Sequence, residues 1–442
     1  MPVAPYPVKL GSDLLQRLSN ARARTDQLFD IVKPEFLYER PIPERHRIIF
    51  YIGHLEAFDW NLLRDRLLRL SSFHPAYDQL FAFGIDPVGG GLPDDKPGDW
   101  PTLPEVRNYV KRIRESIDEG LRALSSGSEA ADVPEFPPSQ LLNVAIEHRL
   151  MHAETLAYMF HQLPSDQKAF QPRAPEPVHE DFKPEMIRIP AGPATLGLDR
   201  SEFGWDNEFE LHTETVPAFS IDKYKVTNRQ WLEFIQAGGY ENQALWTKEA
   251  WIWKSDRNIS HPSFWRRDGD RWYYRTMFEE LRMPLDWPVY VSQAEASAYA
   301  RWQGKSLPTE PQWHRAAYAT NESSERQYPW GNGAPGPNMG NFDFRRWDPV
   351  SVAAFASSQS AFGVAGMLGN GWEWTSTLFH PFKGFERFPF YPGYSADFFD
   401  GKHFVMKGAS SRTAACMLRR SFRNWFQPHY QYVYAGFRCV SE

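Results

Sequence analysis

Two different patterns of hydrophobic and polar positions divide the chain. In roughly the first 165 residues, apolar side chains recur at spacings of three and four, the period of an amphipathic helix. Thr102, Pro104 and Glu105 give one of these segments an N-cap, a first-turn proline and a capping-box acid. Helices with matching apolar stripes predict a four-helix bundle. The predicted helices cover about residues 14–32, 43–68, 102–124 and 141–163.

After the fourth predicted helix the pattern changes. Residues 166–184 are rich in proline and polar side chains, which predicts a linker between a domain at 1–165 and a domain at 185–442. In the second domain, short β-like runs alternate with Gly, Pro and Asn turns, and two or three short helices are expected. The clearest helices are residues 292–303 and the segment after Thr309. This pattern predicts an α+β fold with much irregular structure.

Composition narrows the class of protein. The 17 Trp, 19 Tyr and 32 Phe, together with 36 Pro, indicate loops held in place by aromatic side chains. A net charge of −6 without a long basic run argues against nucleic acid as a partner. Two cysteines favour a reducing compartment over a disulfide framework. With no secretory pattern at the N-terminus and no apolar stretch near the ~20 residues that span a bilayer, we expect a soluble, cytoplasmic protein.

A pair of histidines in the fourth predicted helix carries the first chemical signal. Because His148 and His152 are four residues apart, their side chains lie one above the other on one helix face. Two imidazoles in this arrangement can bind one metal ion, although helical His pairs without a metal are common. His54, in the second predicted helix, could join the pair if these helices face each other, or could be a core histidine bonded to a neighbour.

Six motifs in the second half resemble the formylglycine-generating (sulfatase-modifying) family, which has a C-type-lectin-like fold. The motifs are, in order, Met186–Gly192, Tyr224–Asn228, Pro288–Ser292, Leu307–Trp313, Met367–Thr375 and Gly436–Cys439. Within them we expect Trp313, Trp372 and Trp374 to be core residues. The family's copper site uses two cysteines five residues apart, and the matching positions here are Cys416 and Ser421. A hydroxyl is a poor ligand for Cu(I), so that activity is not expected, and Cys416 is interpreted as a buried or half-buried small residue.

The first half resembles the DinB-like bundle that precedes the same scaffold in the sulfoxide synthases of ergothioneine and ovothiol biosynthesis. The resemblance rests on Gly53-His54 and on the His-x-x-x-His-x-Glu pattern from His148 to Glu154. It implies that His54, His148 and His152 bind a non-haem Fe(II) ion and that O2 is a co-substrate. It further implies the substrate hercynine, the trimethylated betaine of histidine, and a site at the junction of the two domains.

The same resemblance assigns further residues. Asn424 and Trp425 match the pair that binds the betaine. The donor side of the pocket would include Met151, Phe426 and Tyr430, where the family carries a Gln, an Asp and an Arg in enzymes that use γ-glutamylcysteine. These departures favour a smaller or differently charged donor, such as cysteine. The family's acidic tyrosine has three candidates here, which are Tyr391, Tyr394 and Tyr77.

The resulting prediction is an enzyme of the non-haem iron oxidoreductase class. It would be a sulfoxide synthase that couples hercynine with cysteine or γ-glutamylcysteine in ergothioneine biosynthesis. Three alternatives stay open: a selenoneine synthase that couples a selenosugar to hercynine, an ovothiol-type synthase that acts on histidine, and a non-catalytic lectin-like module with a metal. The expected partners are small molecules, and neither the oligomeric state nor a structural Ca²⁺ follows from the sequence.

Overall fold

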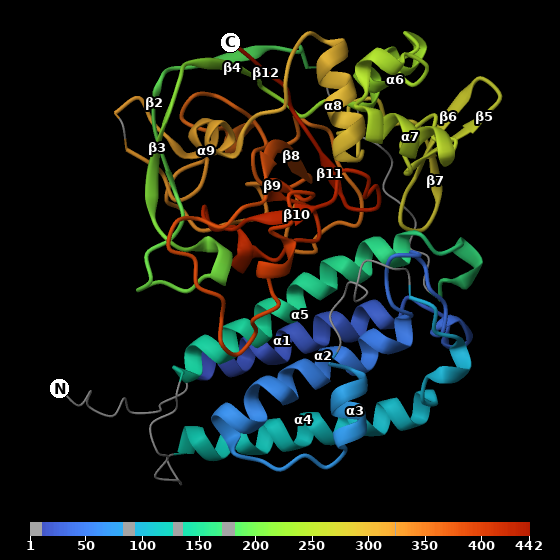
Figure 1. Cartoon of the computed structure of the whole chain (residues 1–442), viewed down its shortest axis with the longest axis vertical. Coiled ribbons are helices and arrows are strands. Elements are labelled where there is room, and N and C mark those ends of the chain that lie inside the picture. Colours follow the sequence, from blue (N-terminus) through green and yellow to red (C-terminus); the bar gives the residue numbers. More distant parts are fainter. Residues whose placement is uncertain (1–10, 83–92, 127–135, 170–181, 323) are drawn as a thin grey trace. The chain divides into compact units, whose positions relative to one another are not determined.

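The computed structural model describes residues 11–82, 93–126, 136–169, 182–322 and 324–442. The chain forms two compact units, Met1–Gln171 and Pro172–Glu442, each described here by itself (Figure 1). The division falls inside the segment predicted as a linker, most of which lies outside the described residues.

The first unit is a helical bundle, as its hydrophobic pattern predicts. Its long helices pack α1 against α5, and α2 against both α4 and α5 (Figure 1). The capping of α4 is confirmed, because the Glu105 carboxylate accepts hydrogen bonds from the backbone N–H and the hydroxyl of Thr102. The helices are α1 (Ser12–Phe29), α2 (Ile48–Leu63), α3 (Pro75–Leu80), α4 (Leu103–Ser126) and α5 (Pro138–His161).

Two of these helices are buried on almost every side. A π-helical turn, Arg64–Leu68, extends α2, so the predicted end of this helix was correct although its regular part stops earlier. Because α2 and α5 pack against several neighbours, even their polar side chains are enclosed. This enclosure places ionisable groups in the bundle interior, where each must find a partner. The enclosed ionisable residues include His54, Glu56, Asp59, His148, Arg149 and His152.

The second unit is built around a small sheet with the strand order β10-β9-β8-β11. Its strands β8 and β11 are parallel and the other neighbours are antiparallel. Helix α9 (Glu310–Tyr318) packs against β8 and β9 (Figure 1). These four strands are β8 (Gly371–Leu378), β9 (Phe404–Ala409), β10 (Asn424–Phe426) and β11 (Ala435–Gly436).

Three smaller sheets complete the β structure that the described residues show. They have the orders β1-β4-β12, β2-β3 and β5-β6-β7. Their strands are β1 (Met186–Ile189), β2 (Gly192–Leu196), β3 (His212–Val216), β4 (Phe219–Asp222), β5 (Trp265–Asp268), β6 (Arg271–Arg275), β7 (Glu280–Arg282) and β12 (Val440–Ser441).

The helices of the second unit include the two that were predicted and two that were not. Ser292 and Thr309 cap α8 and α9 through capping boxes with Glu295 and Gln312, as their sequences predict. The expectation of two or three short helices was too low, because α6 and α7 make four in the described residues. These helices are α6 (Asn228–Gln236), α7 (Lys248–Asp256), α8 (Gln293–Trp302) and α9 (Glu310–Tyr318).

The core of the second unit is aromatic with ion pairs set inside it. Trp313, Trp372 and Trp374 are buried, which confirms their assignment to the core. The indole N–H of Trp313 donates to Glu373, whose carboxylate also pairs with Arg438 at 2.7 Å. None of the helices in the described parts of the chain combines the length and apolarity that crossing a bilayer requires.

Candidate metal centre

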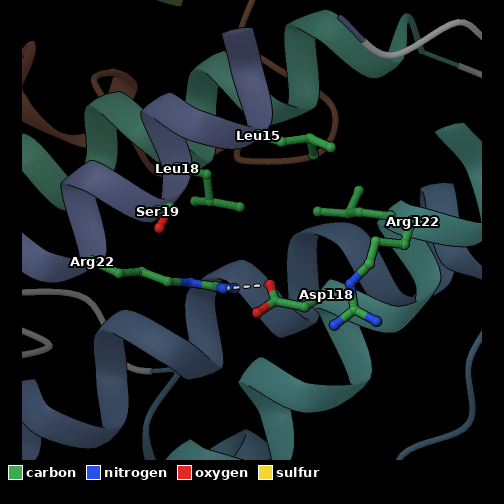
Figure 2. Close-up of a pocket in the computed structure, with 7 residues that line it drawn as sticks. Leu15, Leu18, Ser19, Arg22, Asp118 and Arg122 are labelled. Carbon is green, nitrogen blue, oxygen red and sulfur yellow. Dashed lines mark hydrogen bonds and ion pairs between the residues drawn. The ribbon is translucent and has the colours of Figure 1, made fainter. Parts of the chain in front are cut away.

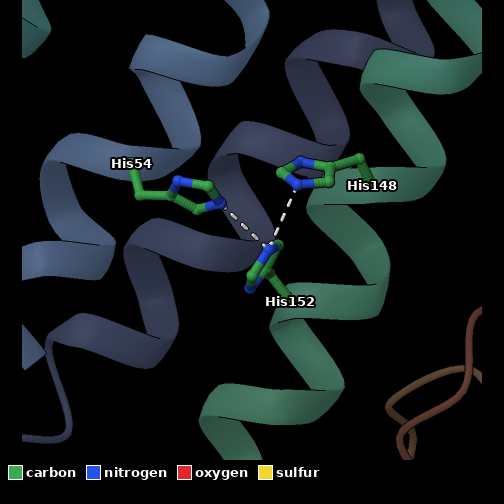
Figure 3. A group of neighbouring side chains, drawn as sticks. All are labelled: His54, His148 and His152. Carbon is green, nitrogen blue, oxygen red and sulfur yellow. Dashed lines mark hydrogen bonds between the residues drawn. The ribbon is translucent and has the colours of Figure 1, made fainter. Parts of the chain in front are cut away.

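Three histidines from two helices meet inside the bundle. His54 lies in the middle of α2, and His148 and His152 lie one turn apart on α5. All three are buried and their rings point toward one another (Figure 3). The Nε2 atom of His152 lies 3.2 Å from that of His54 and 3.1 Å from that of His148. The structure therefore brings His54 to the pair that the four-residue spacing predicts.

These distances fit a shared metal ion. Two nitrogens that each lie about 2.1 Å from one ion are about 3.0 Å apart at a right angle and about 3.4 Å apart at a tetrahedral angle. The two measured Nε2–Nε2 distances fall between these values. No carboxylate or thiolate joins the three nitrogens within the described part of the chain. Three ligands are one fewer than a closed structural zinc site uses, so coordination positions would be left for other molecules.

A backbone carbonyl sets the tautomer of His54. Its Nδ1 lies 2.7 Å from the carbonyl oxygen of Phe81. Because a carbonyl oxygen only accepts hydrogen bonds, Nδ1 carries the proton, and Nε2 presents its lone pair to the other two histidines. The residue before His54 must be small, because a Cβ on Gly53 would lie 2.5 Å from the Phe81 ring. The Gly53-His54 pair thus has a physical reason: glycine lets Phe81 approach closely enough for its carbonyl to reach the imidazole.

Burial keeps the three imidazoles in the form that binds metals. Loss of hydration lowers the pKa of His54 to about 4, although the bond to Phe81 opposes the shift. Burial also lowers the pKa values of His148 and His152 well below their usual range, and the neighbouring histidines add to the effect. All three are therefore neutral at pH 7 in the metal-free protein. A neutral imidazole is the species that donates a lone pair to a metal ion.

Aromatic rings line the histidine cluster. The ring of Phe58 stacks on His148 with centroids 3.4 Å apart, and the ring of Phe50 stacks on His54 at 4.8 Å. Tyr51 contacts His152 at 5.8 Å. These rings pack against the imidazoles and limit the rotation of their side chains.

The residues proposed to bind hercynine lie in the second unit. Asn424 and Trp425 are neighbours on β10, and the side-chain oxygen of Asn424 accepts a hydrogen bond from the backbone N–H of Trp425. The Trp425 ring stacks on Phe379 at 4.2 Å and also contacts Tyr394 and Phe398 at 5.4 and 5.6 Å. Trp425 is half-buried. It is therefore part of an aromatic cluster that retains some exposure.

The three candidate tyrosines have different surroundings. Tyr394 is buried between Trp205, on which it stacks at 4.0 Å, and Trp425. Tyr391 contacts the same Trp205 at 6.4 Å and Tyr394 at 5.7 Å. Tyr77 lies in the bundle, where its ring is 5.8 Å from that of Phe81, the residue whose carbonyl accepts from His54. Partial burial raises the pKa of Tyr77.

Phe426 and Tyr430, which were predicted to lie on the donor side of the pocket, contact each other. Their rings stack with centroids 4.9 Å apart, and Tyr432 packs against the edge of Tyr430. Met151 lies on α5 between the two histidines and is half-buried. Phe426 and Tyr430 thus form an uncharged aromatic stack, at positions where the resemblance implies an Asp and an Arg in enzymes that use γ-glutamylcysteine.

The prediction for Cys416 was wrong. Cys416 is exposed, not buried or half-buried. It lies in a 3-10 turn, Ala415–Met417, whose buried position is taken by Met417. Ser421, at the position of the family's second copper cysteine, is buried and donates to the carboxylate of Glu208 at 2.6 Å.

A group of buried charges beside the histidines was not predicted from the sequence. Arg149 is completely buried and pairs with Glu56 and Asp59. Burial acts to raise the pKa of Glu56, but Arg149, Arg114 and Arg22 lower it to about 2. The sequence does carry a signal for this cluster, because charged residues occur within two otherwise apolar helices. Such residues are rarely buried without a partner, so they indicate buried ion pairs.

Comparisons with known proteins place both units in described families. The first unit matches the DinB superfamily over residues 17–156, and the second matches the sulfatase-modifying factor enzyme 1-like domain over residues 171–442. A histidine cluster in a DinB-type bundle that precedes a sulfatase-modifying-factor-type domain defines a class of two-domain enzymes.

Relatives of nearly the same length define the family. The hercynine oxygenase of Mycolicibacterium thermoresistibile is 31% identical, and the match covers 97% of this chain and 94% of the relative. The hercynine oxygenase of Mycobacterium tuberculosis is 33% identical, with 96% and 97% covered. Ergothioneine biosynthesis protein 1 of Neurospora crassa is 27% identical over 92% of this chain and 55% of its own length. The chain belongs to the hercynine oxygenase family.

Proposed function

We propose that this enzyme is an Fe(II)- and O2-dependent sulfoxide synthase that joins a sulfur donor to hercynine in ergothioneine biosynthesis. The observation that carries the proposal is the convergence of three neutral imidazole nitrogens in a member of the hercynine oxygenase family, with no carboxylate among them in the parts of the chain that the structure describes. Relatives named hercynine oxygenase and ergothioneine biosynthesis protein 1 support the substrate and the pathway.

Iron(II) suits a set of three histidine nitrogen ligands. Iron(II) bound by His54, His148 and His152 would supply open positions for a thiolate and O2, together with the redox chemistry that C–S coupling needs. The neutral ligands compensate none of the ion's charge, which favours an anionic thiolate as a further ligand. Zinc also binds three histidines, so coupling activity of the Fe(II)-loaded protein is the property that identifies iron as the working metal.

The aromatic cluster around Trp425 suits the trimethylammonium group of hercynine. A quaternary ammonium ion is attracted to the faces of Trp, Tyr and Phe rings, and it has no N–H to donate. Trp425, Phe379 and Tyr394 provide such rings within one cluster. Asn424 would orient the imidazole or carboxylate of hercynine through its side-chain N–H groups. Holding the imidazole carbon beside the bound sulfur then makes the coupling a local reaction.

Cysteine is the donor that the Phe426–Tyr430 stack favours. Two stacked aromatic rings carry no charge with which to bind the extra carboxylate of γ-glutamylcysteine. A selenosugar is the second candidate, because sugar rings pack well on aromatic faces and need no ion pair. Met151 would add a soft, adaptable side chain on the helix that carries the metal ligands.

Tyr394 is the first of the three tyrosines to test as the acid of the reaction. Its ring lies 5.4 Å from that of Trp425, the residue proposed to bind the trimethylammonium group. A tyrosine hydroxyl at this point would supply a proton during O2 reduction and favour sulfoxide formation over simple oxidation of the thiol.

The donor comparison tests the proposal. The full chain is loaded with Fe(II) without oxygen, then supplied with air, hercynine and one donor, and the products are identified by mass spectrometry. The donors are cysteine, γ-glutamylcysteine and a selenosugar, and histidine replaces hercynine in a parallel set. We expect a cysteine–hercynine adduct that contains one additional oxygen. Coupling with the selenosugar alone would assign the enzyme to selenium metabolism, and the absence of every product would refute the proposed function.

A further inference from the structure

A buried ion cluster lies on the two helices that carry the histidines. Arg149 directly follows His148 on α5, and Glu56 and Asp59 follow His54 on α2. The side chains of Arg149 and Asp59 are 0% exposed, and that of Glu56 is 1% exposed. We call these three residues the Arg149 cluster.

The guanidinium of Arg149 bridges α5 and α2. It donates to the Asp59 carboxylate at 2.6 Å, to the Glu56 carboxylate at 2.9 Å and to the backbone carbonyl of Leu55 at 3.0 Å. These three acceptors lie on α2, within five residues of His54, and a longer bond of 3.4 Å reaches the hydroxyl of Thr25 on α1. Because the guanidinium is a rigid, planar fork, it can satisfy all of them only at one relative position of the two helices.

Other ion pairs of the bundle do not depend on the Arg149–Asp59 pair. Glu56 also accepts from Arg114 on α4, at 2.6 and 2.8 Å, and Arg114 pairs with Asp26 on α1. The Arg149–Asp59 pair is therefore the part of the network that joins only α2 and α5. Removing both of its members leaves Glu56 paired with Arg114.

Stability alone does not account for such a pair. Taking two charges out of water costs about as much as their attraction returns, and apolar replacements of buried pairs are often neutral or stabilising. The best attested use of buried ionic groups is to fix the register of packed helices. The histidine cluster needs a fixed register, because a shift of one residue along a helix moves a side chain by about 1.5 Å, whereas metal–ligand distances tolerate about 0.2 Å.

We propose that the Arg149 cluster is a positioning group that fixes the register of α5 against α2 and thereby keeps His54, His148 and His152 at metal-binding distances. The inference rests on the proposed metal site. It concerns residues that need not touch the metal or a substrate.

The test replaces the pair by apolar side chains and measures metal binding by the full chain. Arg149→Met combined with Asp59→Leu removes one positive and one negative charge. We expect the double variant to stay folded, with unchanged or higher thermal stability. We further expect its affinity for Fe(II), titrated without oxygen, to fall by about 10- to 100-fold, the usual effect of losing a group that orients metal ligands. The absorption spectrum of the Co(II)-loaded protein should change as well, because that spectrum reports coordination geometry.

A matched control uses an ion pair of the same bundle on other helices. Arg22 on α1 donates to Asp118 on α4 at 2.6 Å, beside a pocket of about 180 Å³ that contains none of the three histidines (Figure 2). Because Arg22 also lies 3.9 Å from Glu56 of the Arg149 cluster, the control changes only its partner on α4. Asp118→Asn should leave the Fe(II) affinity and the Co(II) spectrum unchanged. A loss of affinity in this control equal to that in the double variant would overturn the proposal.

Arg149→Lys decides the question if the double variant does not fold. Lysine keeps the charge but lacks the planar fork that reaches three acceptors. We expect weaker Fe(II) binding and an altered Co(II) spectrum in this variant. Wild-type affinity and spectrum in either the double variant or Arg149→Lys would overturn the proposal while leaving the proposed function intact. Failure of the wild type itself to bind Fe(II) would instead refute the metal site on which the inference rests.

Discussion

At the scale of single residues, the histidine cluster depends on contacts that lie outside the histidines. The carbonyl of Phe81 fixes the tautomer of His54, and Gly53 makes room for the Phe81 ring. The four-residue spacing predicted the pairing of His148 and His152, because helix geometry is local. That His54 joins them followed from the resemblance to a family and not from its surroundings in the sequence, because the contact is tertiary. Arg149 was not predicted, because a charged residue on a helix is usually solvated.

Gly53→Ala should weaken the metal site. Its Cβ would lie 2.5 Å from the Phe81 ring and push the carbonyl away from His54. We expect a destabilisation of about 1–3 kcal/mol from overpacking and a lower Fe(II) affinity. Gly120→Ala on α4 is the control, because its nearest contact is the end of the Leu68 side chain at 3.0 Å. Thermal unfolding and anaerobic titration of both variants check this prediction, and a Gly53→Ala protein with normal affinity would contradict it.

Asp206→Asn should change how stability depends on pH. Burial raises the pKa of Asp206 from 3.8 to about 6, although Ser395 donates to its carboxylate. An acid with a raised pKa in the folded state stabilises the protein while protonated, and this contribution is lost as the pH rises through about 6. Relative to the wild type, the variant should therefore gain roughly 1–2 kcal/mol between pH 5 and pH 7.5. Denaturant unfolding at several pH values measures the difference, and a constant difference would show that Asp206 does not titrate in this range.

Tyr394→Phe should divert the reaction without preventing substrate binding. Phenylalanine keeps the ring contacts with Trp205 and Trp425 but removes the hydroxyl proton. We expect normal iron content and hercynine affinity, with oxidised thiol replacing part or all of the coupled sulfoxide. Tyr391→Phe and Tyr77→Phe are analysed in parallel by mass spectrometry. An unchanged product ratio in Tyr394→Phe, with a changed ratio in one of the others, would reassign the role.

At the scale of elements, the helices that local signals predicted are ones in which a cap and an apolar stripe coincide. The capping boxes of α8 and α9 are examples. The same kind of box, Thr227 with Gln230, begins α6, but its sequence overlaps a family motif and was not interpreted as a helix. Helix α7 carries Trp251 and Trp253 without a regular apolar stripe, and α3 has six residues, too few for periodicity to show. Short elements thus depend on tertiary packing, which a sequence pattern does not encode.

Strand β10 provides a test of substrate recognition. Trp425→Ala should raise the KM for hercynine by about 2- to 30-fold, the range expected for loss of a cation–π contact, while the KM for the sulfur donor changes less. Trp425→Phe should have a smaller effect, because it keeps an aromatic face toward Phe379. Steady-state kinetics with each substrate varied in turn separates the two effects. Equal KM increases for both substrates in Trp425→Ala would indicate general damage to the site.

At the scale of the whole molecule, the sequence predicted the order and the kind of the two domains. The helical period ends and the proline-rich segment begins close to the boundary between the two compact units. The two units differ in the residues that their interiors enclose. The bundle encloses histidines and an ion cluster, whereas the second unit encloses tryptophans and ion pairs such as Glu373–Arg438. The proposed metal ligands belong to the first unit and the proposed hercynine residues to the second, so the proposed activity needs the full chain.

The most direct test of the central claim is the iron stoichiometry of the wild type and of His152→Ala. His152 is central to the cluster, because its Nε2 lies within 3.2 Å of the Nε2 atoms of both other histidines. In anaerobic Fe(II) titrations we expect the wild type to bind one iron per chain and the variant to bind none tightly, while both remain folded. Retention of one tightly bound iron and of coupling activity by His152→Ala would contradict the assignment of the metal site.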